Sequence, residues 1–367
     1  MALPSSGSAI AFSQIETEFG QNSDRDLGEY RVSQTVGDLS NQPLDTGVPQ
    51  SGAIKFSNFY SKRLNVIIDY YSGSTENRPD DARTKYQAAS KSGNRTVIGF
   101  PATKDRISGN SSGSKVRIHV NKTIGSAVGN VNNCAVRTGS FETGTVVTVE
   151  VGSSGKLYGA GGNGGHGGTG ESSGCGSSNR DGCNGDAGTS GLGVQYSGTT
   201  VINNGVISAG YGGGGGGGYR KVEREENWGG PVWGASGGGG GGGQGLPVGE
   251  GGGGSSSGAD GTTTAGGNGG NGGENNQAHG GGGGGGGSNG NGGEGGNGND
   301  GAGGGATKGG DGASGTHTGS IENENNVTGG GGTGGGNGAA IRRTSGITVN
   351  IPSTSGITGA TDATGVS

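Results

Sequence analysis

The sequence predicts a mainly β protein whose C-terminal part is a bundle of packed polyglycine-II helices. Glycine supplies 101 of the 367 residues and only 25% are hydrophobic, so side-chain burial cannot order the whole chain. Charged residues amount to 14%, and a net charge of -5 gives little self-repulsion to keep the chain expanded. Many glycine runs also carry another residue at every third position. Together these observations indicate that the glycine backbone itself forms a packed core.

The glycines are unevenly distributed, and their distribution predicts three regions. Only 15 of the 101 lie in residues 1–150. We expect an N-terminal docking segment at residues 1–63, a small β domain at residues 64–151 and the glycine-rich bundle at residues 152–367.

The N-terminal segment contains one short module twice. Residues 7–15 (GSAIAFSQI) are echoed by residues 52–59 (GAIKFSNF). In the first copy Ser13 stands three residues before Glu16, a capping-box spacing that predicts a short helix from Gln14 to about Phe19. With so few apolar side chains the segment should not fold stably alone. This favours docking to a partner, and the alternative is a flexible, partly helical tail.

Four runs rich in β-branched residues predict strands in the middle region, arranged as a small β-sandwich or meander. The runs are residues 64–68, 96–100, 115–120 and 145–151. In the third run Val116, Ile118 and Val120 share one face. His119 is therefore expected to face solvent.

A second repeat lies at the entrance to the glycine region. Residues 151–162 align with residues 201–212, and a weaker copy lies at residues 351–359. Each copy has the pattern of a strand, a tight turn and a second strand, and the first two continue into a glycine run. The recurrence predicts strands that stack beside one another as a platform for the glycine runs.

The glycine runs are of two kinds. Pure runs occupy residues 212–218, 237–243 and 280–287. In the other runs every third residue is not glycine: Asn163, His166 and Thr169; Asn268, Asn271 and Glu274; Asn291, Glu294, Asn297 and Asp300. A polyproline-II helix has three residues per turn, so these residues would line one solvent edge and the pure runs would lie in the middle of the bundle.

Energetics predict that the bundle forms as a whole. Ordering one glycine costs about 1–2 kcal/mol, whereas one hydrogen bond returns about 0.5–1.5 kcal/mol, so each helix needs several neighbours. We expect about six to ten short helices. A flexible glycine-rich linker is the alternative, and eight prolines are too few for collagen.

No constellation of residues supports catalysis, a metal or a cofactor. The four histidines are scattered, and there is no Walker motif, zinc-spaced Cys/His set or nucleophile elbow. One match to a calcium-binding nonapeptide, at residues 295–302, follows from the glycine content. Cys175 and Cys183 could pair across a short loop, but free thiols are favoured.

Bulk properties exclude two classes of partner. A mildly acidic chain without a basic block offers nothing to nucleic acid. The longest apolar stretch, near residues 66–71, is too short for a membrane helix, and the first residues lack the basic and apolar regions of a secretory signal. We expect neither nucleic-acid binding nor membrane insertion.

The loops between glycine runs hold most of the large side chains of the region and are the candidate binding sites. The first choices are Tyr219, Arg220, Lys221, Trp228 and Trp233. Aromatic and arginine side chains on rigid loops are typical binding hot spots. Equally, the two tryptophans could fold back as an apolar plug on the end of the bundle. Shorter candidates are residues 203–204, 246–248 and 274–279.

Glycine runs separated by diverse loops, and preceded by strand pairs such as residues 203–207, resemble the receptor-binding adhesins at the tail-fibre tips of T-even-like bacteriophages. The similarity covers about residues 152–350. Separately, SGAIKFSNFY at residues 51–60 resembles a short repeat of tailed-phage virion proteins.

The resemblance implies a virion protein, assembled in the host cytoplasm, whose polyglycine-II sandwich presents receptor-binding loops. Its expected partners are a tail or fibre protein, bound through residues 1–63, and a host surface protein or glycan. A structural filament or decoration subunit is the alternative. An ice-binding protein is disfavoured because the period-three positions lack a regular Thr or Ala array.

Overall fold

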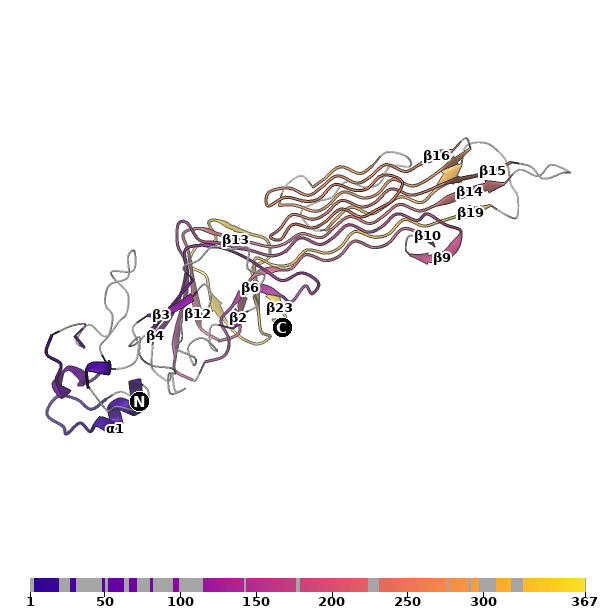
Figure 1. Ribbon diagram of the computed structural model, residues 1–367. Helices are drawn as coiled ribbons and strands as arrows, with labels where there is room; N and C mark the ends of the chain where they lie inside the picture. The colour runs from indigo at the N-terminus through magenta and orange to yellow at the C-terminus, as the bar shows by residue number, and fades with distance from the viewer. Residues whose placement is uncertain are drawn as a thin grey trace.

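The protein is elongated and mainly β (Figure 1). The computed structural model describes residues 3–19, 27–30, 48–49, 52–62, 66–70, 80–81, 95–98, 115–141, 143–175, 179–223, 231–275, 277–289, 292–296, 308–317 and 326–366. Helix α1 (Phe12–Phe19) and the 3-10 helices η1 (Leu27–Tyr30) and η3 (Phe56–Phe59) lie at the N-terminal end. Sheets follow, and glycine segments run side by side from them to the far end.

Three strand ladders surround one apolar core. The first runs in the order β3 (Arg95–Ile98), β1 (Val66–Tyr70), β4 (Lys115–Val120), β7 (Val146–Val151), β12 (Thr199–Asn203), β21 (Val349–Asn350). The second is β5 (Thr123–Gly125), β8 (Lys156–Tyr158), β13 (Val206–Ser208), β22 (Ile357–Thr358). The third is β2 (Asp80–Asp81), β6 (Cys134–Arg137), β11 (Ser190–Val194), β20 (Ile341–Arg343), β23 (Ala363–Thr364).

Every pair in these ladders except β1 with β3 is parallel. From β4 onward, each turn of the chain adds one strand to each ladder, which is the arrangement of a parallel β-helix. The expected strand runs are present as β1, β3, β4 and β7, but the predicted β-sandwich is wrong in topology. Alternating hydrophobicity identifies a half-buried strand and carries no information on its partner or direction.

Equivalent apolar residues stack along the core. Ile124, Leu157, Ile207 and Ile357 are paired in register on successive turns, and the first three are buried. This confirms that the repeated segments near residues 151, 201 and 351 lie side by side. The first half of the repeat is shifted, because Val151 pairs with Asn203.

His119 does not face solvent as predicted. Its exposed fraction is 6%, it lies opposite Glu150 in the parallel ladder, and its ring approaches Gly152. The inward face of β4 is formed by Val116, Ile118 and Val120, as expected. On the outward face Lys115 is exposed and Arg117 is partly buried, whereas His119 is covered because it lies near the C-terminal end of β4, beside Glu150 and Gly152.

The two N-terminal modules have the same local geometry. The N–H of Ala11 donates to Oε1 of Gln14 at 2.8 Å, and the N–H of Lys55 donates to Oδ1 of Asn58 at 2.8 Å. In each copy an amide three residues ahead therefore caps the start of the helix. Helix α1 begins at Phe12, so the predicted cap at Ser13 is wrong: Ala11 precedes the helix, and its carbonyl accepts the first bonds, from the N–H groups of Gln14 and Ile15.

Two links between the second and third ladders are greatly extended and contain the glycine runs. Residues 159–189 connect β8 to β11, and residues 209–340 connect β13 to β20. Both excursions therefore leave the β-helix at the same corner and return to it.

Backbone hydrogen bonds join the glycine segments with a period of three. In the run 212–218, three successive N–H groups donate to three different neighbouring segments. The pattern then repeats, so that N–H groups three residues apart, from Gly213 to Gly218, donate to the same segment. The acceptors, at 2.8–2.9 Å, lie in residues 183–186, 238–241 and 310–313. Carbonyls of the run and its flanking residues accept in the same rotation from residues 162–168, 281–287 and 329–335. The central run thus has six hydrogen-bonded neighbours.

Close approach of these backbones leaves no room for side chains. All three pure runs are buried along their whole length, whereas His166, Asn268 and Asn271 are exposed. A Cβ added at Gly215 would collide with the carbonyl group of Gly332. Glycine is therefore required here by packing.

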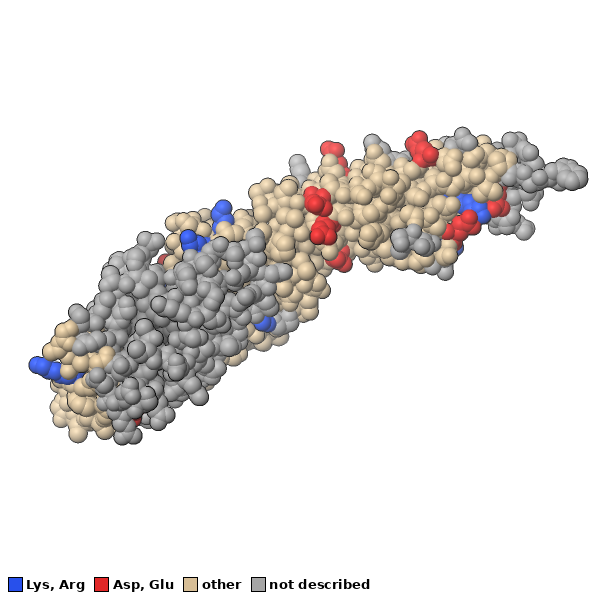
Figure 2. All heavy atoms as spheres, in the orientation of Figure 1, with Lys and Arg blue, Asp and Glu red and all other residues tan. Residues whose placement is uncertain are grey.

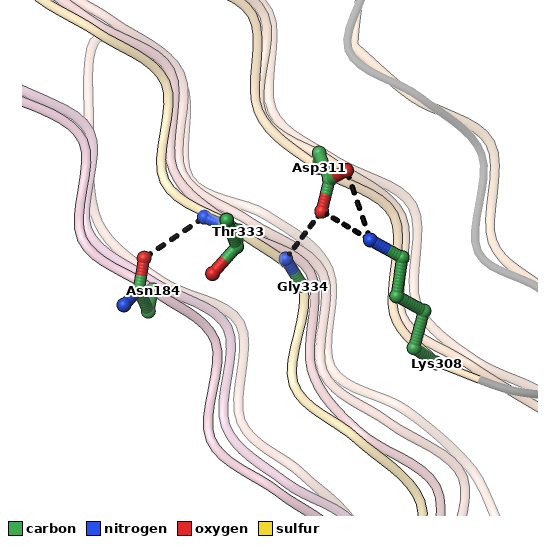
Figure 3. A network of polar contacts seen from close by, with 5 residues as sticks. All are labelled: Asn184, Lys308, Asp311, Thr333 and Gly334. Carbon is green, nitrogen blue, oxygen red and sulfur yellow. Dashed lines mark hydrogen bonds and ion pairs between the residues drawn. The ribbon is translucent and has the colours of Figure 1, made fainter.

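Polar side chains complete the hydrogen bonding at the rim of the glycine segments (Figure 3). Oδ1 of Asn184 accepts from the N–H of Thr333 at 2.9 Å, and Oδ1 of Asp311 accepts from the N–H of Gly334 at 2.8 Å. Asp311 also pairs with Lys308 at 2.8 Å. Asn163, His166 and Asn268 accept from backbone N–H groups in the same way. These residues satisfy donors at the edge of the array.

We predict that Gly215→Ala lowers the melting temperature strongly and that Gly336→Ala does not. Overpacking typically costs about 1–3 kcal/mol, and Gly215 has a backbone neighbour where the methyl group would lie. Gly336 is exposed and has no atom within 4 Å of the added Cβ. Calorimetry of both variants provides the measurement, and equal melting temperatures would contradict the packing.

Acidification should remove the contribution of the Asp311 carboxylate to the stability of the folded protein. The hydrogen bonds from Lys308 and then from Gly334 lower the pKa of Asp311 below its ordinary value of 3.8. Because the pKa is lower in the folded state, the stabilisation is present above pH 4 and is lost as the pH falls through the folded-state pKa.

Asp311→Asn keeps an acceptor for Gly334 but loses the ion pair. The stability difference from wild type should therefore be present at pH 6 and shrink below about pH 4. Lys308→Met is the matched variant and should follow the same course. Thermal unfolding between pH 3 and pH 7 measures both, and a difference independent of pH would refute the assignment.

Candidate functional site

Two small antiparallel sheets close the far end of the glycine segments (Figure 1). One contains β15 (Val232–Ala235), β14 (Arg220–Glu223) and β19 (Val327–Thr328), and the other contains β16 (Glu274–Asn275), β17 (Ala278–His279) and β18 (Thr316–His317). Val222, Ala235 and Ala278 form a buried apolar cluster between them. The far end is thus a compact cap, built where outgoing segments turn back.

Tyr219 and Arg220 continue the central glycine run into this cap. The N–H of Tyr219 donates to the carbonyl of Arg180 at 2.7 Å, and its own carbonyl accepts from Gly329 at 2.7 Å. Burial, and then the nearby Glu171 carboxylate, raise the pKa of the Tyr219 hydroxyl. Arg220 is 6% exposed, and its guanidinium donates to the hydroxyl of Thr328. Burial lowers the pKa of Arg220.

Lys221 lies between two carboxylates. Its Nζ is 2.5 Å from Glu223 and 2.9 Å from Glu171. The hydrogen bonds that Lys221 donates to Glu223 and then to Glu171 raise its pKa, so the ammonium is charged at neutral pH. Figure 2 shows basic and acidic side chains next to one another near the far end. Among the described residues the cap therefore carries charges of both signs, with two carboxylates beside the Lys221 ammonium.

Trp233 packs against the cluster of Val222, Ala235 and Ala278 and is partly buried. This contact is the one expected of an apolar plug. Trp228 lies outside the described residues. Val232, on the same strand as Trp233, is 54% exposed.

A loop that the sequence did not single out lies beside these residues. It contains β9 (Ser172–Cys175) and β10 (Asn179–Asp181), and it supplies Glu171 and Arg180 to the contacts above. Cys175 and Cys183 form a disulfide, with Cα atoms 4.9 Å apart, so the expectation of free thiols is wrong. The eight-residue separation allowed pairing, and the structure brings the sulfurs together where β9 and β10 pair, with Asp181 in register with Cys175.

The shorter candidates divide between the two ends of the glycine segments. Residues 274–279 form β16 and β17 in the cap. Leu246 lies at the opposite end, where its carbonyl accepts from the N–H of Ser126 at 3.1 Å. Asn203 belongs to the β-helix, and its amide donates to the carbonyl of Ser355 at 2.7 Å. Leu246 and Asn203 therefore make hydrogen bonds within the β-helix end of the protein and lie away from the cap.

The described residues contain no group of three or more His, Cys, Asp or Glu side chains placed to hold a metal ion. Nor does any helix in this part of the chain have the length and apolarity to cross a membrane.

Comparison with protein families identifies the class of protein. The family model described as "Phage tail fibre adhesin Gp38" matches residues 85–295, more than half of the chain. The chain belongs to this adhesin family. Comparisons with curated proteins and with solved structures find no match.

The match includes the loop from Tyr219 to Trp233 and all three pure glycine runs. The adhesin is a tail-fibre protein of T-even-like phages that functions in receptor binding, so the resemblance drawn from the sequence is confirmed. Its family is one of adhesins and not of enzymes, and it places the protein in the virion.

Trp233→Ala should loosen the cap of the adhesin, and Val232→Ala should not. A fully buried Trp→Ala substitution costs about 3–5 kcal/mol, and we expect about 2 kcal/mol for the partly buried Trp233. Hydrogen exchange of the β14 and β15 amides measures the local effect. Equal protection in the two variants would show that Trp233 does not hold the cap together.

Proposed function

We propose that the glycine segments are polyglycine-II helices packed as a bundle. The rotation of backbone donors through three neighbours with a period of three supports this most directly, because it is the symmetry of a helix with three residues per turn. Burial of the pure runs agrees with it, as does the exposure of the period-three residues His166, Asn268, Asn271, Glu274 and Glu294. Asn163 and Thr169 are partly exposed, and Asn291, Asn297 and Asp300 lie outside the described residues.

We further propose that the far end of this bundle contacts the receptor, through Tyr219, Arg220, Lys221, Trp228 and Trp233. The cap combines aromatic and charged side chains on a frame fixed by backbone hydrogen bonds. Such a frame reduces the conformational entropy that loops lose on binding. The receptor is a host surface protein or glycan.

Some of these residues would act mainly by shaping the surface. Arg220 is buried against Thr328, and Trp233 packs on the apolar cluster. Tyr219 and Lys221 are only partly buried. Direct contact is therefore proposed first for Tyr219 and for Lys221 with its acidic partners, while residues 224–230, Trp228 among them, lie outside the described residues.

Residues 1–63 are proposed to dock the adhesin to a tail or fibre protein of the virion. The duplicated module supports this, since both copies start a short helix in the same way and Phe12 and Phe56 meet with ring centroids 6.2 Å apart. Phe56 remains 39% exposed. Residues 64–151 are proposed to act as a β spacer and residues 152–367 to form the glycine-rich region. Strands β12 and β20–β23 of the second region also belong to the β-helix.

Loop exchange tests the receptor-binding end. Replacing residues 219–233 with the corresponding loop of an adhesin from a phage of different host range should change host adsorption and leave the melting temperature within a few degrees. The matched control replaces the turn at residues 262–265, which lies at the other end of the bundle beside Gln244. Changed adsorption with the control turn and not with the loop would refute the proposal.

A further inference from the structure

The loop at residues 171–181 is tied to the cap at three points. Glu171 pairs with Lys221 at 2.9 Å, the carbonyl of Arg180 accepts from the N–H of Tyr219 at 2.7 Å, and Oδ1 of Asp181 accepts from the N–H of Gly330 at 2.9 Å. The loop therefore lies directly beside the proposed receptor contacts.

The outer part of this loop depends on the disulfide for its order. In the part of the chain that the structure describes, strands β9 and β10 form a two-stranded sheet with no further strand, and such a ribbon is marginally stable by itself. Ser172, Gly174 and Cys175 are exposed. Among the described residues, Cys175 is in register with Asp181 across this small sheet, Asn179 donates to the carbonyl of Cys175 at 2.8 Å, and the disulfide adds the covalent tie to Cys183. A crosslink removes much of the conformational freedom of such a loop.

We propose that the described residues 171–175 and 179–181 form part of the receptor-contacting surface, and that the Cys175–Cys183 disulfide is a reducible staple on which receptor binding depends. This rests on the proposed function of the far end. The oxidised loop is held against β14 and presents a fixed surface, whereas the reduced loop must be ordered by the receptor and binds more weakly.

The chemistry is thiol–disulfide exchange. A dithiol reductant transfers two electrons, so that the S–S bond breaks, both sulfurs become thiols and the reductant closes its own disulfide. Oxidised glutathione reverses the step through a mixed disulfide and leaves as two reduced glutathione molecules. Cys175 is exposed and thus accessible to both reagents.

The third cysteine does not interfere with this exchange. Cys134 lies in β6 with an exposed fraction of 0%, and burial raises the pKa of its thiol to about 12. The thiolate is the reactive form, so Cys134 is inert in the folded protein at neutral pH.

The test measures binding of the purified full-length adhesin to host cells before and after reduction with dithiothreitol, and again after reoxidation with oxidised glutathione. We expect reduction to weaken binding about tenfold, which corresponds to about 1.4 kcal/mol, and reoxidation to restore it. Thiol titration should detect two reactive thiols after reduction and none before. The double variant Cys175→Ser/Cys183→Ser should bind like the reduced protein and should not respond to dithiothreitol.

A substitution on the loop surface tests the contact independently of the disulfide. Ser172→Tyr adds bulk at an exposed position of β9 and should weaken binding without lowering the melting temperature. Ser153→Tyr is the matched control, because Ser153 is exposed on the β-helix.

The outcomes separate this inference from the proposed function. If complete reduction and Ser172→Tyr leave binding unchanged while exchange of residues 219–233 changes it, the inference is wrong and the function stands. If reduction lowers the melting temperature of the whole adhesin in parallel with binding, the disulfide supports the fold in general and the inference is also wrong. If none of the cap changes affects binding, the proposed function fails.

Discussion

The structure depends on the contact between glycine backbones, in which N–H groups and carbonyl groups of separate segments meet at hydrogen-bonding distance from all sides. Six segments surround residues 212–218 at this spacing, and a single Cβ at Gly215 would collide with a carbonyl group. One hydrogen bond cannot offset the entropy of an ordered glycine. Each segment is therefore stable only when its neighbours are present.

The β-helix provides the starting points for this array. Apolar residues such as Leu157 and Ile207 stack on successive turns, and both glycine excursions leave from the end of these neighbouring strands. Their first residues are consequently held side by side. This lowers the cost of bringing distant segments together and sets the register in which their hydrogen bonds pair.

The backbone N–H groups at the edges of the packed glycine segments need other partners, because an outer segment lacks neighbours on one side. Asn184 and Asp311 accept from backbone N–H groups there, and their exposure keeps the rim hydrated. At the far end Val222 and Trp233 replace glycine contacts with a small apolar cluster. The adhesin thus combines a closely packed glycine interior with a cap of aromatic and charged side chains, and the proposed receptor contacts on such a support would lose little entropy on binding.

Local patterns determined much of this molecule from sequence alone. Period-three spacing distinguished the exposed positions such as His166 from the buried pure runs, and the repeat predicted that Leu157 and Ile207 lie side by side. The runs of β-branched residues located the strands, because those signals depend on the side chains of one segment.

The tertiary structure decided what depends on pairs of distant segments. It turned the expected β-sandwich into a parallel β-helix, buried His119, joined Cys175 to Cys183 and brought residues 171–181 beside Lys221. Glycine has no side chain whose pattern could predict which segments pack together. The order and direction of the glycine segments are therefore seen only from the hydrogen bonds between them in the tertiary structure.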